Sequence, residues 1–450
     1  MADSTNYGTK ISANDYIYGG DKTKWTKFAY GVIVSNLASL SNKSNFTTAY
    51  ADSLILCASK SFTSNDDNAT LSVAGGSASS AYSSYNNYWG IYRGNVGYSY
   101  FQHDYAVQVM TGTVFDYDQA TGNRIPNDQD NKYYPYYLAA KQIICDTLKT
   151  TGHYDPRMAV KLSTTDDATY ANINNADSVK AYKYYGGSFG SAAGPIGTAP
   201  SLYGSTATTY DVTKVGPGRW LFRDNAPYIL MTCAELKFDL AEAYWKKGDK
   251  DNALAAFKDG VTADLAFTAK YLTPGTANST NIGDKISTSL FNKLAAEYVA
   301  GPYVGGITSD NLTLSNIMMQ KWVALYPWGA LEAWTDMRKY FYDISYSDNY
   351  PYLNNGWDIN TVSQKWDTDA SKVYKGFYLS PAQVAGRKGT YNTKNHGSPC
   401  FRIRPRYNSE YMWNLPALKG LLPIAGTAEN YQCSIPWFAY PGDLPTSINN

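Results

Sequence analysis

The 450-residue sequence predicts a mainly α-helical protein, built as a tetratricopeptide-like helical-repeat scaffold with long irregular loops. Three observations favour this fold class. Apolar residues recur at helical spacing in several segments. One segment has the small and large residues of a tetratricopeptide repeat. Long stretches rich in Ser, Asn, Gly and Tyr separate the helical patterns, as expected of loops.

The first predicted helix begins near Asp21, with Asp21 or Thr23 as its N-cap. A second apolar pattern, Tyr50 to Ala58, follows a Ser/Asn turn and is expected to pair with it. The spacing of apolar residues in the first helix predicts a single buried face that consists of Trp25, Phe28, Ala29, Val32, Ile33 and Leu37.

The next part of the chain is expected to be loop-rich. Residues 61–136 and 161–226 are predicted to be irregular, because Gly, Pro, Ser and Asn interrupt any apolar period. A short amphipathic helix is expected at 137–149 between them.

Residues 227–342 form the most recognisable helical-repeat portion. Within Pro227 to Phe267, small residues would let two antiparallel helices approach, a glycine would turn the chain, and two rings would fill the gap. These positions are Ala241, Ala253, Gly248, Tyr244 and Phe257. One repeat cannot bury its own faces, so helices at 284–300 and 313–342 are expected to stack on it. Residues 343–450 are expected to be ordered loops.

The charge balance argues against a nucleic-acid partner. Lys and Arg number 39 against 38 Asp and Glu, and no basic run occurs. The 42 tyrosines, 11 tryptophans and 15 phenylalanines, with many hydroxyl and amide side chains, suit neutral polar partners instead. Many of these rings could equally pack in the core and at helix junctions.

Five widely spaced cysteines, with no metal-ligand spacing, predict buried free thiols: Cys57, Cys145, Cys233, Cys400 and Cys433. The polar start has no signal-peptide pattern or lipobox cysteine, which is compatible with a cytoplasmic protein or with a processed chain. No apolar stretch is long enough to span a membrane.

Catalytic signatures are sparse, and no enzyme activity, cofactor or metal is predicted. The three histidines, His103, His153 and His396, occur in unrelated segments. The paired carboxylates of a glycosidase can have any spacing in sequence, which makes four helical residues candidates: Glu235, Glu242, Glu332 and Asp336. Each is expected instead to be an exposed or helix-bridging charge. The acidic loop 116–122 departs from the EF-hand pattern, and calcium binding by this loop is left as an alternative.

An aromatic loop at residues 82–101 is the better candidate for a ligand site. Sugar rings present apolar C–H faces with a rim of hydroxyls, and proteins hold them with flat rings beside hydrogen-bonding groups. We expect the ligand-binding residues Tyr85, Asn86, Asn87, Trp89, Tyr92 and Arg93, with Tyr303 and Trp357 as outlying contacts. Anchoring of the loop to the helices is the other interpretation of these aromatics.

Several motifs together resemble the SusD/RagB family of outer-membrane glycan-binding lipoproteins. Asp15-Tyr-Ile-Tyr-Gly-Gly-Asp21 with Lys-Trp25 resembles the entry to a family helix, and Asp155-Pro-Arg157 a family tripeptide. Further matches follow in family order up to about residue 415: Ala234 to Phe257, Ile317 to Leu325, Glu332-Ala-Trp334-Thr-Asp336-Met-Arg338, and Arg404 to Asn414.

The resemblance implies a single SusD-like domain over residues 1–450. It also implies a lid on a TonB-dependent (SusC-like) transporter of the outer membrane, on the cell-surface side, which passes oligosaccharide inward without cleaving it. Trp25, Trp322 and Trp334 match structural positions of the family.

Two features depart from the family pattern. The family's N-terminal lipoprotein part is expected to be absent, either because the chain is trimmed or because its first repeats are missing or rebuilt. Membrane contact is then expected only through the absent lipid anchor. Asn408 also stands where the family usually has Pro. A glycoside hydrolase and a peptide- or protein-binding helical adaptor remain the alternatives.

Overall fold

The computed structural model describes residues 14–71, 101–111, 152–163, 218–272, 286–340, 400–403 and 431–440, together with a few short pieces between them. Helices dominate these residues. They are α2 (Lys22–Ala38), α3 (Phe46–Ala49), α4 (Ala51–Ala58), α6 (Asp104–Thr111), α8 (Arg157–Lys161), α10 (Cys233–Lys247), α11 (Lys250–Ala269), α12 (Thr288–Ala300), α13 (Leu314–Leu325) and α14 (Ala330–Lys339). Single 3-10 turns are η1 (Asn65–Asp67), η5 (Trp220–Phe222) and η8 (Tyr431–Cys433).

Helices α10 and α11 form the antiparallel pair predicted from the repeat pattern. Ala241, Ala253 and Phe257 are fully buried where the two helices meet. Gly248 adopts a left-handed φ of 78° after α10, which glycine does without a steric penalty, and its N–H bonds back to the Tyr244 and Trp245 carbonyls. The next residue, Asp249, caps α11 through its side chain. The predicted repeat unit is therefore confirmed.

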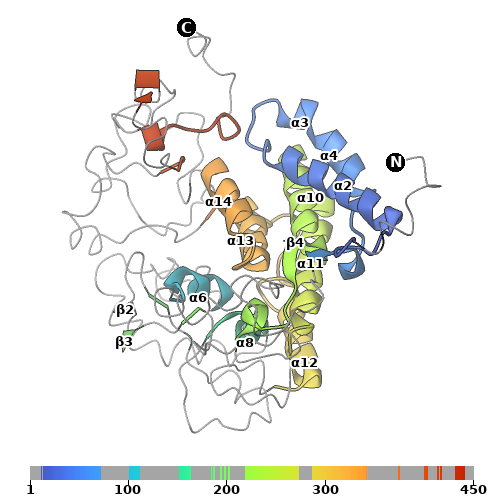
Figure 1. The fold of residues 1–450 in the computed structure, drawn as a ribbon, viewed down its shortest axis with the longest axis vertical. Coiled ribbons are helices and arrows are strands. Elements are labelled where there is room, and N and C mark those ends of the chain that lie inside the picture. Colours follow the sequence, from blue (N-terminus) through green and yellow to red (C-terminus); the bar gives the residue numbers. More distant parts are fainter. Residues whose placement is uncertain are drawn as a thin grey trace.

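Other helices stack around this pair, as one repeat requires (Figure 1). The N-terminal helices α2 and α4 pack on α10 and on each other, and α13 packs on the same helix. Helices α8 and α12 pack on α11, and α14 follows α13. The core residues fall into three clusters, one under α2 and α4, one between α10, α11 and α13, and one under α6, α8 and α12.

The predicted buried face of α2 is partly wrong. Val32 and Ile33 are 37% and 43% exposed and Ala29 is exposed, whereas Gly31, Val34 and Ala38 are buried. The reason is close packing. A Cβ on Gly31 would lie only 2.7 Å from the Met231 Sδ, so the helix turns its smallest residue toward its neighbours. Asp21 is the N-cap, accepting hydrogen bonds from the Thr23 and Lys24 amides.

Two other boundaries differ from the prediction. The helix expected over 313–342 is divided into α13 and α14, because Pro327 has no N–H to continue the first helix and Tyr326 before it is extended. The stretch 61–136, expected to be irregular, contains helix α6 and strand β1 (Ala69–Leu71). The predicted helix at 137–149 and most of the loops at 343–450 lie outside the described residues.

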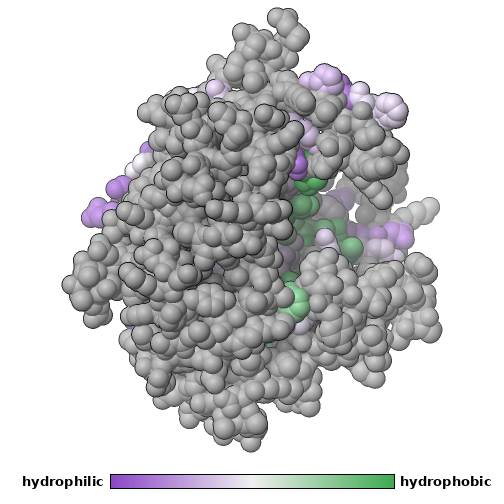
Figure 2. Space-filling view, turned by 90° about the vertical axis from the view of Figure 1, so that its left-hand side faces the viewer, coloured by the Kyte–Doolittle hydropathy of each residue, from purple (hydrophilic) through white to green (hydrophobic). Residues whose placement is uncertain are grey.

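Short strands complete the described fold. Strand β1 pairs antiparallel with β4 (Tyr228–Met231), which leads into α10, and β2 (Ala193–Gly194) pairs with β3 (Gly197–Thr198). On the face shown in Figure 2, hydrophobic residues of the described part are visible in a recess, with hydrophilic ones beside them and at the edges of the view. None of the described helices is both long and apolar enough to cross a membrane.

The described cysteines are free thiols with different environments. Cys233 is buried, and burial raises its pKa to about 11. Cys57 is half-buried and Cys400 is exposed, so the expected burial is wrong for Cys400. Cys400 follows a Gly-Ser-Pro segment with no apolar period to bury it, whereas Cys57 follows Leu-Ile-Leu on α4.

Candidate functional site

Most of the predicted ligand residues lie outside the described residues. This holds for the aromatic-loop residues Tyr85, Asn86, Asn87, Trp89, Tyr92 and Arg93, and for the outlying Trp357. The acidic loop 116–122 also lies outside them. Their roles therefore stay predictions.

Tyr303 is the predicted ligand residue that the structure does describe. It lies in the loop between α12 and α13, is half-buried, and meets the His153 ring edge-on at a centroid distance of 5.5 Å. Two glycines make this contact possible: a Cβ on Gly301 would lie 2.2 Å from the Gly152 carbonyl oxygen. The two loops thus touch through their backbones, and an aromatic pair stands beside the contact.

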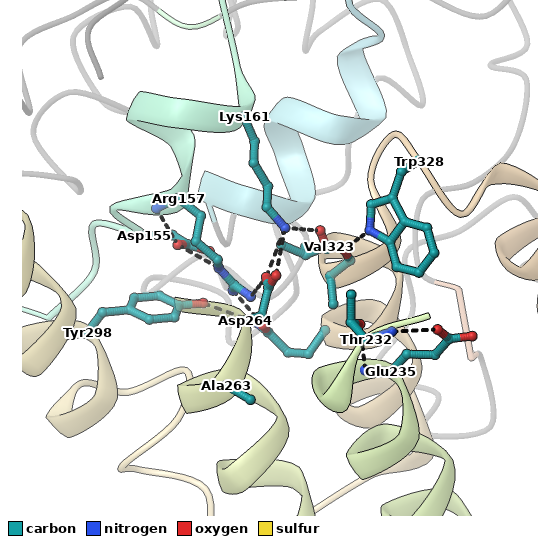
Figure 3. A network of polar contacts seen from close by, with 12 residues as sticks. Asp155, Arg157, Lys161, Thr232, Glu235, Ala263, Asp264, Tyr298, Val323 and Trp328 are labelled. Atoms are coloured by element: carbon teal, nitrogen blue, oxygen red, sulfur yellow. Dashed lines mark hydrogen bonds and ion pairs between the residues drawn. The ribbon is translucent and has the colours of Figure 1, made fainter. Parts of the chain in front are cut away.

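A buried ion network lies around Arg157 on α8 (Figure 3). It reaches Tyr298, whose ring centroid lies 6.5 Å from that of Tyr303. The Arg157 guanidinium donates to the Asp155 carboxylate in a bidentate arrangement at 2.7–3.0 Å and to Asp264 Oδ2 at 2.8 Å. Lys161 Nζ, one turn further along α8, also donates to Asp264, at 2.9 and 3.0 Å. The network therefore connects α8 to α11 with two carboxylates against two cations.

Neutral groups complete this network. Arg157 donates to Gln320 Oε1 at 2.6 Å, and the Gln320 amide donates to the Tyr298 hydroxyl at 3.0 Å. These contacts join α8 to α11, α12 and α13.

The two cations of this network have opposite pKa shifts. Burial disfavours the charge of Arg157, but the carboxylates of Asp155 and Asp264 outweigh this effect and raise the pKa of the Arg157 side chain. For Lys161 burial prevails over Asp264, and its pKa is lowered to about 8.

A second buried ion network joins α10 to α13 and α14. Lys321 Nζ bridges Asp239 and Asp336, both at 2.6 Å. Lys339 Nζ bridges Glu242 at 2.7 Å and Asp336 at 3.0 Å, and donates to the Ala38 carbonyl at 3.0 Å. The Glu242 carboxylate also accepts hydrogen bonds from the Ser41 and Tyr340 hydroxyls. Each of these carboxylates thus forms an ion pair within the helical scaffold.

The four carboxylates considered for glycoside hydrolysis do not form an accessible pair. Glu242 and Asp336 are buried in the second network, as the helix-bridging interpretation expects, and Glu332 is exposed on α14. Glu235 is buried and closes a capping box with Thr232 at the start of α10 (Figure 3). A sugar ring in solvent cannot reach the three buried groups.

Comparison with known proteins identifies the family of the chain. Residues 2–357 match the SusD-like family whose description is "Starch-binding associating with outer membrane". That match covers well over half of the sequence. The chain belongs to the SusD-like family. The motifs noted in the sequence had indicated the same family, and the family's description associates it with the outer membrane.

Solved structures give more distant similarities. The chain is similar to a SusD/RagB family protein from Bacteroides thetaiotaomicron, with 21% identity over 73% of this chain and 55% of that one, and a TM-score of 0.35. SusD homologues from Bacteroides fragilis and Parabacteroides distasonis each have 16% identity over 96% of this chain. They are covered to 72% and 69%, with TM-scores of 0.44 and 0.47.

The chain spans little more than half the length of the first of these structures, and 57% of a second SusD homologue from Bacteroides fragilis. No curated protein matches the sequence significantly.

The tryptophans at SusD-like motif positions are in scaffold contacts. Trp25 donates to Asp15 Oδ2 at 2.7 Å, and Trp322 packs against the Tyr105 and Tyr326 rings. Trp334 donates to the Tyr342 hydroxyl at 3.0 Å. All three rings are half-buried, not fully buried. Their assignment to the scaffold is supported by these contacts.

The motif Asp15 to Asp21 has a plain structural role in this SusD-like chain. The Asp15 carboxylate accepts hydrogen bonds from the Ile17, Tyr18 and Gly20 amides as well as from Trp25. It thereby closes the turn that leads into α2.

The sequence analysis did not predict the first ion network, and of the second it predicted only that Glu242 and Asp336 could bridge helices. The signal available was a charged residue at a position where the helical period places apolar neighbours, such as Asp264 near Val261 and Leu265, or Lys321 between Met318 and Val323. Such a charge on a core face must find a buried partner. The sequence does not say which one, because the partners lie on other helices.

Proposed function

We propose that this SusD-like protein binds a neutral oligosaccharide or polysaccharide on the cell-surface side of the outer membrane. It delivers the sugar uncleaved to a TonB-dependent, SusC-like transporter. The observation that carries this proposal is the family match over residues 2–357, with its description as starch-binding and outer-membrane-associated. Residues 1–450 would act as one SusD-like domain, held at the membrane through a lipid anchor of the full-length protein.

The distribution of charge supports a neutral ligand. Buried pairs within the scaffold use Arg157, Lys161, Lys321 and Lys339, together with the carboxylates that face them. The net charge of the sequence is only +1. These four cations stabilise helix contacts, and the proposal assigns recognition to rings, hydroxyls and amides.

The aromatic loop supplies the proposed contacts. Tyr85, Trp89 and Tyr92 would stack on sugar faces, and Asn86, Asn87 and Arg93 would bond to hydroxyls. Trp357 and Tyr303 would extend this surface. Tyr303 is the described member of this proposed set: its half-buried ring meets His153 beside a backbone contact of two glycines and packs against Tyr298.

The test is retention by polysaccharides in affinity gel electrophoresis, with starch and a panel of other neutral and acidic polymers. Wild-type protein is expected to be retarded by at least one polymer. Trp89→Ala and Tyr92→Ala are each expected to weaken binding by about tenfold, since loss of one stacked ring costs ~1–3 kcal/mol by analogy with base stacking. Tyr228→Ala, an exposed tyrosine on β4, is the matched control and should bind like wild type.

The same assay separates the alternatives. Release of reducing ends by the purified protein would favour a glycoside hydrolase. Absence of glycan binding together with clear peptide binding would favour a peptide- or protein-binding adaptor. Co-purification of full-length protein with an outer-membrane transporter tests the partner.

A further inference from the structure

Trp437 stands at the tip of a turn in the last described segment, with 54% of its surface exposed. The turn is closed by the Ala439 and Tyr440 amides, which donate to the Pro436 carbonyl at 2.9 and 3.2 Å. On either side of the tip the chain is buried, with Ile435 and Ala439 both at 0% exposure. A turn anchored on both sides presents its exposed ring in one position.

Side chains from distant segments hold this turn. The Asn42 amide, which is buried, donates to the Ala439 carbonyl at 3.1 Å and to the Lys339 carbonyl at 3.0 Å. The Arg402 guanidinium donates to the Ser434 and Ile435 carbonyls at 3.2 and 3.3 Å. These bonds fix the backbone both before and after the exposed ring.

The neighbouring ring is fixed as well. Phe438 lies 5.3 Å from the Arg338 guanidinium, which in turn stacks on Trp334 at 3.8 Å. Phe438 therefore points toward α14 while Trp437 points outward. Within this turn, Phe438 anchors the chain to the protein and Trp437 is left on the surface.

A cation covers one face of the outward ring. Lys43 Nζ lies 5.1 Å from the Trp437 ring centroid, a cation–π contact that restrains the side chain. More than half of the Trp437 surface stays exposed to solvent beside this contact. An aromatic ring restrained in this way loses little conformational freedom when it binds a ligand.

We propose that Trp437 is a second carbohydrate contact, on which the apolar face of a sugar ring stacks. This site is separate in sequence from the aromatic loop 82–101, and the inference rests on the proposed function. It assigns to the C-terminal turn the capture of a further stretch of the same polymer. A long chain that touches two contacts is retained better than a short one, because the second contact is made at high local concentration.

The experiment compares soluble starch with maltotriose for wild type and Trp437→Ala. Starch binding by Trp437→Ala is expected to weaken about tenfold, the size of one lost ring contact. Binding of maltotriose through the aromatic loop should be unchanged. Trp437→Phe keeps a smaller stacking face and should fall between the two. Tyr16→Ala removes a ring that is similarly exposed, at 51%, and should bind starch like wild type.

The outcomes are distinct. A selective loss of starch binding in Trp437→Ala, with unchanged thermal unfolding, supports the second contact. Unchanged starch binding in this variant, with clear binding by wild type, overturns the second contact and leaves the proposed function in place. If wild-type protein binds neither starch nor maltotriose, the inference is overturned, and the polysaccharide panel shows separately whether the proposed function falls with it.

Discussion

At the scale of single residues, Asp264 shows how this chain uses its charges. It lies on α11 among apolar core positions, and its carboxylate faces Arg157 and Lys161 at once. Burial would make any one of these three charges costly alone. Together with Asp155 they balance, so the local structure depends on the complete set and not on one pair.

Removal of this carboxylate is therefore expected to be strongly destabilising. Asp264→Asn leaves two buried cations facing one carboxylate, which is expected to lower the free energy of unfolding by about 3–5 kcal/mol. Denaturant unfolding measures it. The control on the same helix is Asp259→Asn, whose carboxylate pairs with Lys237 at 3.3 Å and is 61% exposed, where a loss below about 1 kcal/mol is expected. Equal losses in the two variants would contradict the role of burial.

Glu235 gives a second residue-scale prediction, in the dependence of stability on pH. Burial, reinforced by the nearby Asp239, raises the pKa of its carboxyl from 4.5 to about 8. The folded state therefore holds a proton that the unfolded chain releases above its pKa of 4.5. Stability falls as the pH rises from there to about 8, by up to about 1.4 kcal/mol per pH unit.

Glu235→Gln, which is neutral at every pH, should lack this component. Its unfolding free energy relative to wild type is expected to increase between pH 5 and pH 8, as measured by denaturant unfolding at several pH values. Titrating groups remote from Glu235 are common to both proteins and cancel in the difference, whereas Asp239, which is coupled to Glu235, contributes to the same difference. A difference that stays constant across this range would show that Glu235 is ionised in the fold.

At the scale of elements, the α10–α11 contact depends on Gly260. A Cβ at this position would lie 2.8–3.0 Å from three carbons of the Phe238 ring, which is itself fully buried. Gly260→Ala gains about 1 kcal/mol of helix propensity but forces the ring to move. We expect the clash to prevail and the protein to lose about 1 kcal/mol or more in unfolding free energy. In a Phe238→Leu background, where the side chain is smaller, Gly260→Ala should cost less than it does in wild type; an equal or larger cost would contradict the clash.

The helices that the sequence predicts well are those with strong local signals. The α10–α11 pair has small residues, a glycine at the turn and a capping box, all readable from the chain. The face of α2 could not be read from apolar spacing, because the decisive contact is a glycine against Met231 and Leu236 on distant segments. Pro327 indicates the division between α13 and α14, because a proline cannot continue a helix. The apolar pattern runs on past this residue, and for that reason one long helix was predicted.

The candidate site was less predictable than the scaffold for a related reason. Residue type suggested Tyr303 as a ligand contact, but its position depends on the Gly152–Gly301 backbone contact, which joins segments about 150 residues apart. The buried networks depend in the same way on pairings such as Lys321 with Asp239, 82 residues apart. Such partners are selected by helix packing, which residue spacing alone does not contain.

At the scale of the whole molecule, the low net charge and the pairing of buried charges predict how ligand affinity should respond to salt. The sequence is nearly neutral, and within the described helices the buried cations are paired with scaffold carboxylates. Ring stacking and hydrogen bonds to hydroxyls are little affected by ionic strength, whereas exposed charge–charge attraction is screened within about 8–10 Å near physiological salt.

The affinity for a bound polysaccharide is therefore expected to change less than about twofold between 50 and 500 mM NaCl. Calorimetry on wild-type protein measures this, and an acidic polysaccharide from the panel serves as the comparison. If affinity fell about tenfold or more over the same range, exposed cations would dominate recognition. The natural ligand would then be a uronic-acid-containing or sulfated glycan, with Arg93 as the first residue to replace.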